Sequence, residues 1–584
     1  MTYGQAIIGV PSSILLQQRR SAAAAAAPSN GICGQSLDLA LIVADESIGG
    51  KADPAYAAHV GPIFEWAQAV WEQWIPLPAL MRLVASSKLR LARAVRPWSV
   101  VRGPAAAVVA TATRLGWTVH DARRFTTDTG RELDLAIDPP VVVARECEAA
   151  VRRWRWRSVE QDFPSLDSGG AGRGAFFGPV MALLRPKSES PEWTSDLRGA
   201  LRSAVLGRQW PQSRCFAAGY ADHNRCCLCV EAALAHHGVS CIDELPHEVI
   251  DGLPIGNLVH RVWSCPAHRE ARSQYAPDDV RFRQPSSGNT AAYTRALVPS
   301  LDHEVPPPTS EATFSWIVRP EYGTICACFY TDGSRLDGPS ALLARNGWAF
   351  VAIDEHGEIV ASAHGVPPPW IDDIPGTEAW ALLQAAQVAE PGSTYRIDCK
   401  PCVDAIKRGR VWATSAARPL ARVFELVFAA VDDTPLDAFV WMPAHCSMDE
   451  VGVVRLGNGS LLTETDRRGN ALADEYAKAA VEAHRVPSAV RQRLRDAAKE
   501  VQAIAKWLGR VTHLAGHQAG PQRRDSEASQ RATGRRRAAG RQQRRDGAPA
   551  ANPRGALLAV LEPLRARIAA RAATHRGAPE PGVV

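Results

Sequence analysis

The chain has 584 residues, of which 46% are hydrophobic and 22% are charged, and its formal net charge is +6. Because single cores rarely grow past roughly 250–300 residues, the length predicts several domains, and the composition excludes a wholly disordered or fibrous protein. The sequence lacks an uncharged apolar window of about 18 residues, its apolar start carries no preceding basic residues as a secretory signal would, and its 13 Cys are irregularly spaced. We therefore expect an intracellular protein without a membrane segment or a disulfide framework.

The N-terminal part of the sequence is predicted to be helical after a low-complexity segment, residues 1–34. That segment contains the run SAAAAAAPSNG, Ser21 to Gly31, which is typical of a linker. Within residues 35–165 apolar residues recur at helical spacing, so we expect one helical module there, followed by a linker and a helix over 166–224. The clearest predicted stripe consists of Phe64, Ala67, Val70, Trp71 and Trp74.

The run RRWRWR, Arg152 to Arg157, interleaves basic and aromatic side chains near the end of this module. Such interleaving is typical of nucleic-acid surfaces, where guanidinium groups contact phosphates and indoles contact bases or sugars. Trp154 and Trp156 cannot share one helix face, however, and Trp is more often part of the core. The sequence leaves both interpretations open.

Cys and His residues gather between residues 225 and 272. Cys226 and Cys229 form a CxxC pair, whose two-residue gap lets both thiolates face one ion, and His260 and Cys265 complete a tetrahedral set. Four protein ligands leave no open coordination position, so the pattern predicts a structural Zn²⁺. A buried cysteine cluster without metal is the competing interpretation. Alternative ligands are Cys227, His236, His237 and His268.

This segment, a CxxC followed by an HxxxxC ending in CP, resembles the small zinc-binding segment that follows the reverse transcriptase domain in non-LTR retrotransposon polyproteins. The resemblance covers residues 225–272. It implies that the chain corresponds to the C-terminal part of a retroelement polyprotein without its polymerase, in which residues 35–165 would be a region that follows the polymerase. A decaying reading frame is a further interpretation.

Strands and helices are predicted to alternate over residues 322–485. TICACFYTDGS indicates a buried strand that ends at Asp332 and turns on Gly333. Residues 347–366 indicate two more strands around a turn at Asp354–Gly357, which completes a three-strand meander.

A helix, a strand and four further elements are expected after the meander. Residues 376–389 are predicted to be a helix with Glu378 in its first turn, and TYRID a strand that ends at Asp398. Pro401 suits the first turn of the next helix. The later elements are the helix RPLARVFELVFAAV, the strand DAFVWMPAH and the helix GNALADEYAKAAVEAH.

Four acidic residues stand near the ends of these elements: Asp332, Glu378, Asp398 and Asp474. If they converge, like charges at ~3–5 Å would raise one another's pKa, and divalent cations would remove that cost. Oxygen ligands favour hard ions such as Mg²⁺, and two ions can clamp the attacking and leaving oxygens of a phosphoryl displacement.

Residues 322–485 resemble the type 1 ribonuclease H domain, through YTDGS, TEAWALLQA, IDCKPCVDAIKRG, WMPAHCS and GNALADEYAKAA in this order. The resemblance implies an α/β fold, the ribonuclease H-like fold with a mixed five-stranded sheet and helices. It also implies that Asp332 bridges two Mg²⁺ or Mn²⁺ ions, that Glu378, Asp398 and Asp474 complete their sites, and that His445 aids proton transfer or product departure. The reaction would be hydrolysis of the RNA strand of RNA–DNA hybrids.

The chain departs from the family pattern at several positions. A long insertion, MDEVGVVRLGNGSLLTETDRRGN, leaves the final carboxylate open between Asp474 and Asp466, and Cys399 replaces a common Ser. PWIDDIP has the aromatic-x-Asp-Asp pattern of a reverse transcriptase site, but it directly precedes the Glu378 helix, so we interpret Asp372 and Asp373 as loop residues. Basic residues for the hybrid groove would be Lys400, Lys407, Arg408 and Arg410.

The C-terminal part is predicted to contain an amphipathic helix over 487–515 and an Arg-rich, largely disordered tail over 516–584. Residues 521–554 contain ten Arg and three acidic residues, a net charge of +7, without aliphatic or aromatic anchors. Such a segment attracts polyanions. A noncatalytic nucleic-acid-binding module on the same scaffold is the alternative function, and the sequence does not indicate an oligomeric state.

Overall fold

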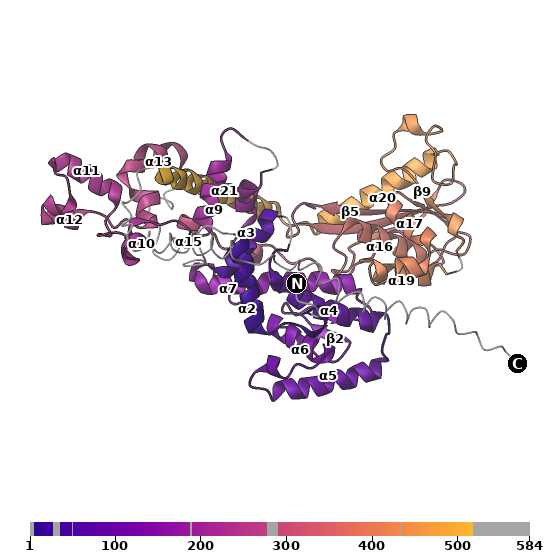
Figure 1. Ribbon diagram of the computed structural model, residues 1–584. Helices are drawn as coiled ribbons and strands as arrows, with labels where there is room; N and C mark the ends of the chain where they lie inside the picture. Colours follow the sequence, from indigo (N-terminus) through magenta and orange to yellow (C-terminus); the bar gives the residue numbers. More distant parts are fainter. Residues whose placement is uncertain are drawn as a thin grey trace, which may run out of the picture. The chain divides into compact units, whose positions relative to one another are not determined.

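The computed structural model describes residues 5–26, 36–48, 51–186, 190–276, 290–432 and 434–517 (Figure 1). These residues divide into two compact units, one with the residues up to Pro211 and from Arg225 onward, the other with Gln212–Asn224. The second unit contains helix α10 (Gln212–Ala217). Among the described helices, none has the length and apolar character needed to cross a membrane.

The N-terminal described region is a helical module with a small antiparallel sheet. Its elements are α1 (Gln5–Ile8), α2 (Ser12–Ala26), α3 (Leu37–Ile48), α4 (Pro54–Trp71), α5 (Leu77–Ala92), η1 (Pro97–Ser99), α6 (Pro104–Leu115), β1 (Thr118–Val119), β2 (Arg124–Thr126), β3 (Glu132–Asp134), α7 (Pro140–Asp162) and η2 (Pro164–Leu166). The buried face of α4 includes Ile63, Trp66, Ala67 and Val70. The predicted stripe was therefore partly wrong: α4 ends at Trp71, and Trp74 beyond it is exposed.

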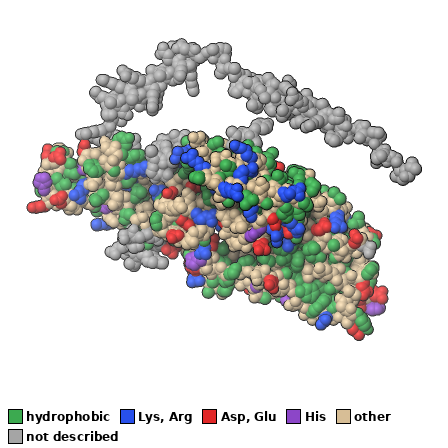
Figure 2. Space-filling model, turned by 90° about the horizontal axis from the view of Figure 1, so that it is seen from below, with side chains coloured by type: hydrophobic (Ala, Val, Ile, Leu, Met, Phe, Trp, Pro, Cys, Tyr) green, Lys and Arg blue, Asp and Glu red, His purple; other side chains and the backbone are tan. Residues whose placement is uncertain are grey.

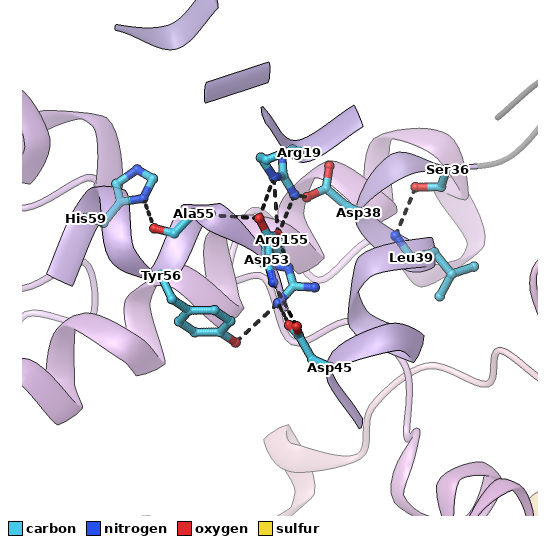
Figure 3. A network of polar contacts seen from close by, with 10 residues as sticks. All are labelled: Arg19, Ser36, Asp38, Leu39, Asp45, Asp53, Ala55, Tyr56, His59 and Arg155. Atoms are coloured by element: carbon cyan, nitrogen blue, oxygen red, sulfur yellow. Dashed lines mark hydrogen bonds and ion pairs between the residues drawn. The ribbon is translucent and has the colours of Figure 1, made fainter. Parts of the chain in front are cut away.

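The residues that were expected to begin a linker instead form the end of helix α2. Buried charged side chains anchor this helix. Alanine is the strongest helix former, so the run from Ser21 continues the helix to Ala26. Arg19 is 4% exposed and hydrogen-bonds to Asp38 on α3 and to Asp53, the N-cap of α4 (Figure 3). The expected start of the module at residue 35 was thus too late. The rest of the run, from residue 27, lies outside the described residues.

Within the run RRWRWR, Arg155 is buried in this module, Arg152 is exposed and the other four residues are partly buried. Arg155 is 1% exposed, pairs with Asp45 and Asp53, and donates a hydrogen bond to the Tyr56 hydroxyl at 3.2 Å (Figure 3). Arg153 and Arg157 form ion pairs with Asp128. Trp154 and Trp156 pack against apolar cores. Of the two interpretations, the core position is the one that the structure supports.

A second group of helices shares an apolar core to which α3 and α7 also contribute. The amphipathic helix expected over 487–515 is α21, and its apolar side chains Val501, Ile504, Leu508 and Val511 are buried. It packs against α9. The main helices of this group are α8 (Gly178–Leu184), α9 (Ser195–Val205), α15 (Thr290–Arg295) and α21 (Ser488–His517).

The C-terminal half contains a mixed six-stranded sheet with helices, so the chain is α/β in this region (Figure 1). The strands are β4 (Ser315–Val318), β5 (Cys328–Leu336), β6 (Arg345–Ile353), β7 (Ile359–Gly365), β8 (Thr394–Ile397) and β9 (Phe439–Trp441), in the order β4-β7-β6-β5-β8-β9. Strands β5 to β7 form the predicted antiparallel meander, and β8 and β9 join it in parallel. Five strands were expected over 322–485 and five lie there; β4 precedes them.

Helices cover both faces of this sheet. They are α16 (Ile374–Ala386), α17 (Lys400–Arg408), α18 (Arg410–Ala413), α19 (Ala421–Ala430) and α20 (Glu464–Ala483). Because side chains alternate along a strand, Phe329 packs in the core with α16, α17 and α19, whereas its neighbour Tyr330 packs in the core with α20. α20 begins earlier than predicted because Thr463 and Asp466 form a capping box at its start.

Candidate metal centres

Three carboxylates from separate elements meet beside the central strands. Asp332 lies on β5, Glu378 lies on α16, and Asp398 directly follows β8. Oxygen atoms of the three side chains all lie within 4.8 Å of one another. Asp332 and Asp398 are neighbours because β5 and β8 are parallel, with Thr331 opposite Ile397. The fold thus brings together three of the four carboxylates that the sequence predicted to converge.

Gly333 is a strand residue and not the turn that we expected after Asp332. It pairs with Trp348 on β6, and β5 continues to Leu336. A Cβ atom at this position would lie 2.6 Å from the backbone nitrogen of Glu378. Gly333 therefore allows α16 to approach β5 closely enough to place Glu378 beside Asp332. Glu378 lies in the second turn of α16, not the first, because the helix begins at Ile374.

The carboxylates of this group oppose one another's ionisation. Burial, followed by repulsion from Asp398 and Asp474, raises the pKa of Asp332 to about 7. Burial and then repulsion from Asp332 hold the pKa of Glu378 well above its usual value. The Oε2 atom of Glu378 is buried without a hydrogen-bond partner among the described residues. Buried carboxylates with unused oxygen atoms fit a divalent cation, whose charge offsets both burial and repulsion.

Asp398 has polar neighbours that stabilise its charged form. Burial raises its pKa, whereas a hydrogen bond from Asn470 and the nearby His445 oppose that rise. His445 is exposed in the loop after β9 and has a φ of 53°, an unusual backbone conformation for a residue other than glycine. Asn470 was not among the site residues predicted from the sequence. Its spacing four residues before Asp474 on α20 places both on one helix face and was a usable signal.

The structure distinguishes the two candidates for the fourth carboxylate. Asp474 on α20 is near enough to raise the pKa of Asp332 and also pairs with Lys478 at 2.7 Å. Asp466 instead accepts hydrogen bonds from Tyr330 at 3.0 Å and from the backbone nitrogen of Thr463 at 3.0 Å. Asp466 therefore caps the start of α20. Asp474 lies outside the group of three that falls within 4.8 Å.

The Asp-Asp pair before α16 is part of the loop, as interpreted from the sequence. Asp373 is the N-cap of α16, and its side chain accepts a hydrogen bond from the backbone of Gly376 at 2.8 Å. The backbone carbonyl of Asp372 accepts a hydrogen bond from Arg335. Both residues therefore serve to position the helix that contains Glu378.

A second group consists of the four predicted zinc ligands, Cys226, Cys229, His260 and Cys265, whose ligand atoms all lie within 4.8 Å of one another. The Sγ atoms of Cys226 and Cys265 are 3.9 Å apart, and Cys229 Sγ is 3.4 Å from His260 Nε2. A hydrogen bond from Cys265 lowers the pKa of Cys226 to about 3. Three sulfurs and one imidazole at this spacing could hold one Zn²⁺.

The short helices around this second group position its ligands. Cys226 is the N-cap of α11, His260 is the first residue of η4 and Cys265 directly follows η4, so that one short helix connects these two ligands. The alternative ligands Cys227, His236, His237 and His268 are not part of the group of four. The elements are α11 (Cys227–His237), η3 (Ile242–Glu244), α12 (His247–Gly252), η4 (His260–Ser264), η5 (Pro266–His268) and α13 (Arg269–Tyr275).

Comparison of the chain with protein-family models, curated proteins and solved structures found no match. The functional interpretation therefore depends on the two groups of side chains and on the order of the elements that position them.

Proposed function

We propose that the acidic group is the active site of a ribonuclease H-like nuclease that hydrolyses the RNA strand of RNA–DNA hybrids with divalent metal ions. The observation that carries the proposal is the convergence of Asp332, Glu378 and Asp398 within 4.8 Å, from positions far apart in the sequence. Buried carboxylates that repel one another are costly unless a cation is bound, so a structural role alone does not account for the group.

The order of elements supports a ribonuclease H-like fold for this domain. Three antiparallel strands, a helix, a parallel strand, the helices α17 to α19, a second parallel strand and a final helix follow the order that the resemblance implies, with the short α18 as one helix more than expected. Strand β4 extends the sheet beyond the expected five strands. It pairs with β7, on the opposite side of β5 from β8, and therefore leaves the acidic group unchanged.

Each residue of the site would have a distinct role. Asp332, Glu378 and Asp398 would hold Mg²⁺ or Mn²⁺, with Asp474 as a further ligand, and Asn470 would orient Asp398. Bound divalent ions supply charge neutralisation and lower the pKa of bound water. His445, exposed beside Asp398, would take up or deliver a proton at the leaving or product oxygen.

The remaining expectations belong to the same proposal. The four Cys and His residues would hold a structural Zn²⁺, and the combination of this segment with the nuclease would make the chain part of a retroelement-derived protein that acts on nucleic acid inside the cell. A noncatalytic nucleic-acid-binding protein is the alternative, and it would bind hybrid without cleaving it.

Cleavage of labelled substrates by the full chain tests the proposal. We expect the parent to cut the RNA strand of a hybrid in Mg²⁺, and to leave duplex DNA, duplex RNA and a hybrid with deoxyribose at the cut site intact, because the 2′-hydroxyl distinguishes RNA from DNA. Asp332→Asn should lose activity by at least about a hundredfold, because an amide supplies no charge to a cation.

A matched substitution controls for the loss of one charge. Asp437 is exposed in the turn before β9, at the end of the parallel strands away from Asp398, so Asp437→Asn should retain full activity. Equal cutting of duplex DNA would contradict the substrate, and activity in Asp332→Asn would contradict the site. Hybrid binding without any cleavage would favour the alternative function.

A further inference from the structure

The sequence CKPC places two cysteines at the start of α17, directly after Asp398. Cys399 is the N-cap of α17, and the backbone nitrogen of Cys402 donates a hydrogen bond to the Cys399 carbonyl at 3.0 Å, which closes the first turn. An N-cap side chain faces the third residue of its helix, so the two thiols point toward the same place. They lie within hydrogen-bonding reach of each other.

The two thiols differ in their access to solvent. Cys399 is partly exposed, whereas Cys402 is 1% exposed and its Sγ lies 3.5 Å from the carbonyl oxygen of Pro375. A reagent in solution therefore reaches Cys399 first, and Cys402 is held ready beside it. Pro401 restricts the backbone between them and so keeps this arrangement fixed.

We propose that Cys399 and Cys402 form a reversible dithiol–disulfide site whose oxidant is a small-molecule disulfide. The Cys399 sulfur attacks one sulfur of the reagent, the S–S bond of the reagent breaks, and one thiol leaves. Cys402 then attacks Cys399 Sγ and displaces the second thiol. Two protein thiols are oxidised, one disulfide is reduced to two thiols, and the two protons pass to those thiols.

The position of Cys399 connects this site to the acidic group. Cys399 directly follows Asp398, and charge on its sulfur would interact unfavourably with the charges of Glu378 and Asp332. A disulfide bond requires the two sulfurs to lie about 2 Å apart, and because Cys399 directly follows Asp398, we expect this closure to shift Asp398. A misplacement of roughly 1 Å can reduce catalysis about a hundredfold. We therefore expect the oxidised form to cleave hybrid poorly, an effect that rests on the proposed function.

Peptide mass analysis of the full chain tests the disulfide without reference to activity. The zinc-loaded protein is incubated with oxidised glutathione, free thiols are blocked with N-ethylmaleimide, and the protein is digested with trypsin. Because trypsin does not cleave before proline, Cys399 and Cys402 remain in one peptide, Ile397–Lys407. We expect this peptide unblocked and two hydrogens lighter than the dithiol, and fully restored by dithiothreitol.

Two comparisons make the result decisive. In Cys402→Ala, Cys399 should remain as a mixed disulfide with glutathione, and the exposed Cys241 should do the same in the parent. Hybrid cleavage by the parent should fall at least tenfold with oxidation, whereas Cys399→Ser should be insensitive.

Modification of Cys241 while Ile397–Lys407 stays a dithiol would overturn the proposal, and an oxidised protein of unchanged activity would overturn its link to the acidic group. A reduced parent without nuclease activity would contradict the proposed function, and the peptide masses would still decide the disulfide.

Discussion

In the acidic group, the pKa of Asp332 lies near neutral pH, far above the pKa of an ordinary aspartate. Its pKa is about 7 in the folded protein and 3.8 in the absence of burial and neighbours. Between these values the folded chain binds more protons than the unfolded chain, so rising pH destabilises the fold. Below pH 4 this penalty is absent, and above pH 7 it is complete. A bound cation removes the penalty because it stabilises the ionised carboxylate.

The first prediction concerns Asp332→Asn in the metal-free protein. The amide does not ionise, so we expect this variant to be more stable than the parent at pH 8, by on the order of 2 kcal/mol, and equally stable near pH 4. Thermal unfolding in EDTA at the two pH values measures the difference. Added Mg²⁺ should stabilise the parent more than the variant at pH 8. A variant that is less stable at both pH values would contradict the account of this carboxylate.

A second prediction concerns the close approach of α16 to β5. In Gly333→Ala the new Cβ would meet the backbone of Glu378 at 2.6 Å, and backbone atoms cannot rotate away, so we expect a loss of roughly 1–3 kcal/mol and an outward shift of Glu378. Unfolding and hybrid cleavage should both show the effect, with cleavage reduced even at temperatures where the variant is folded.

Gly338 provides the matched control for this substitution. A Cβ at Gly338 would meet only the Arg335 side chain, at 3.6 Å or more, so Gly338→Ala should change the free energy of unfolding by less than about 0.5 kcal/mol. If the two alanine variants were equally stable and active, the contact between Gly333 and α16 would not determine the position of Glu378.

The carboxylates and His445 were predicted from the sequence, whereas Asn470 and the role of Gly333 were missed. Asp332, Glu378 and Asp398 each lie in a short motif, and the order of the motifs relates them to one another. Asn470 shares a helix face with Asp474, and the helix predicted from Gly469 included both residues, but an amide is not a typical metal-binding motif and so did not stand out. Gly333 was interpreted as a turn because Asp-Gly is a frequent turn pair, and only packing against α16 reveals its role.

Among the elements, the N-terminal helix α2 shows how a few charges can fix a segment of low complexity. Arg19 lies between Asp38 and Asp53, and Asp53 also caps α4 and pairs with Arg155 (Figure 3). Removal of one member of such a buried network leaves an uncompensated charge, which costs more than the pair itself contributes.

The third prediction follows from this network. Arg19→Met should destabilise the module by roughly 3–5 kcal/mol, because Asp38 loses its partner and Asp53 keeps only Arg155. The neighbouring Arg20 is exposed, so Arg20→Met should be neutral. Limited proteolysis and thermal unfolding would report the loss. Equal stability of the two variants would show that α2 is not anchored through Arg19.

The fourth prediction concerns the Cys and His group around α11. The purified chain should contain about one Zn²⁺, and the double variant Cys226→Ser, Cys229→Ser should lose it, because a structural site needs its thiolates. Elemental analysis measures the metal directly. Cys241→Ser, at an exposed position outside the group, should keep the zinc. Equal zinc in the double variant would place the metal elsewhere.

The lengths of the elements explain which of them the sequence could predict. The meander β5 to β7 and the helix α21 are long enough to show a clear period in their apolar residues. Strands β1 to β3 have two or three residues each, too few for an alternating pattern, and the region was predicted as helical alone. Strand β4 lies before the first motif, and only its pairing with β7 identifies it as part of the sheet.

For the whole molecule, charge is distributed very unevenly between the described part and the C-terminal tail. Basic and acidic side chains both occur on the face drawn in Figure 2. Residues 521–554, by contrast, have a net charge of +7, whereas the entire chain has +6, so the rest of the chain is close to neutral. The tail lies outside the described residues, and its expected disorder stays a prediction from composition. Long-range attraction to a polyanion would therefore come mainly from this segment.

The last prediction tests that role of the tail. Deletion of Pro521–Val584 should weaken hybrid binding and flatten its dependence on salt, because each phosphate contact contributes a slope of roughly −0.7 to −0.9 in a plot of log affinity against log salt concentration. Replacement of the ten Arg of residues 521–554 by Lys should keep the slope, whereas replacement by Gln should reproduce the deletion, since the effect depends on charge and not on guanidinium geometry.

Binding titrations at several salt concentrations measure the slope, and the Asp332→Asn background, expected to be inactive, prevents cleavage during the measurement. The same slope in the deleted and full-length chains would mean that the folded part alone contacts the phosphates. A loss with Lys equal to that with Gln would instead indicate specific guanidinium contacts.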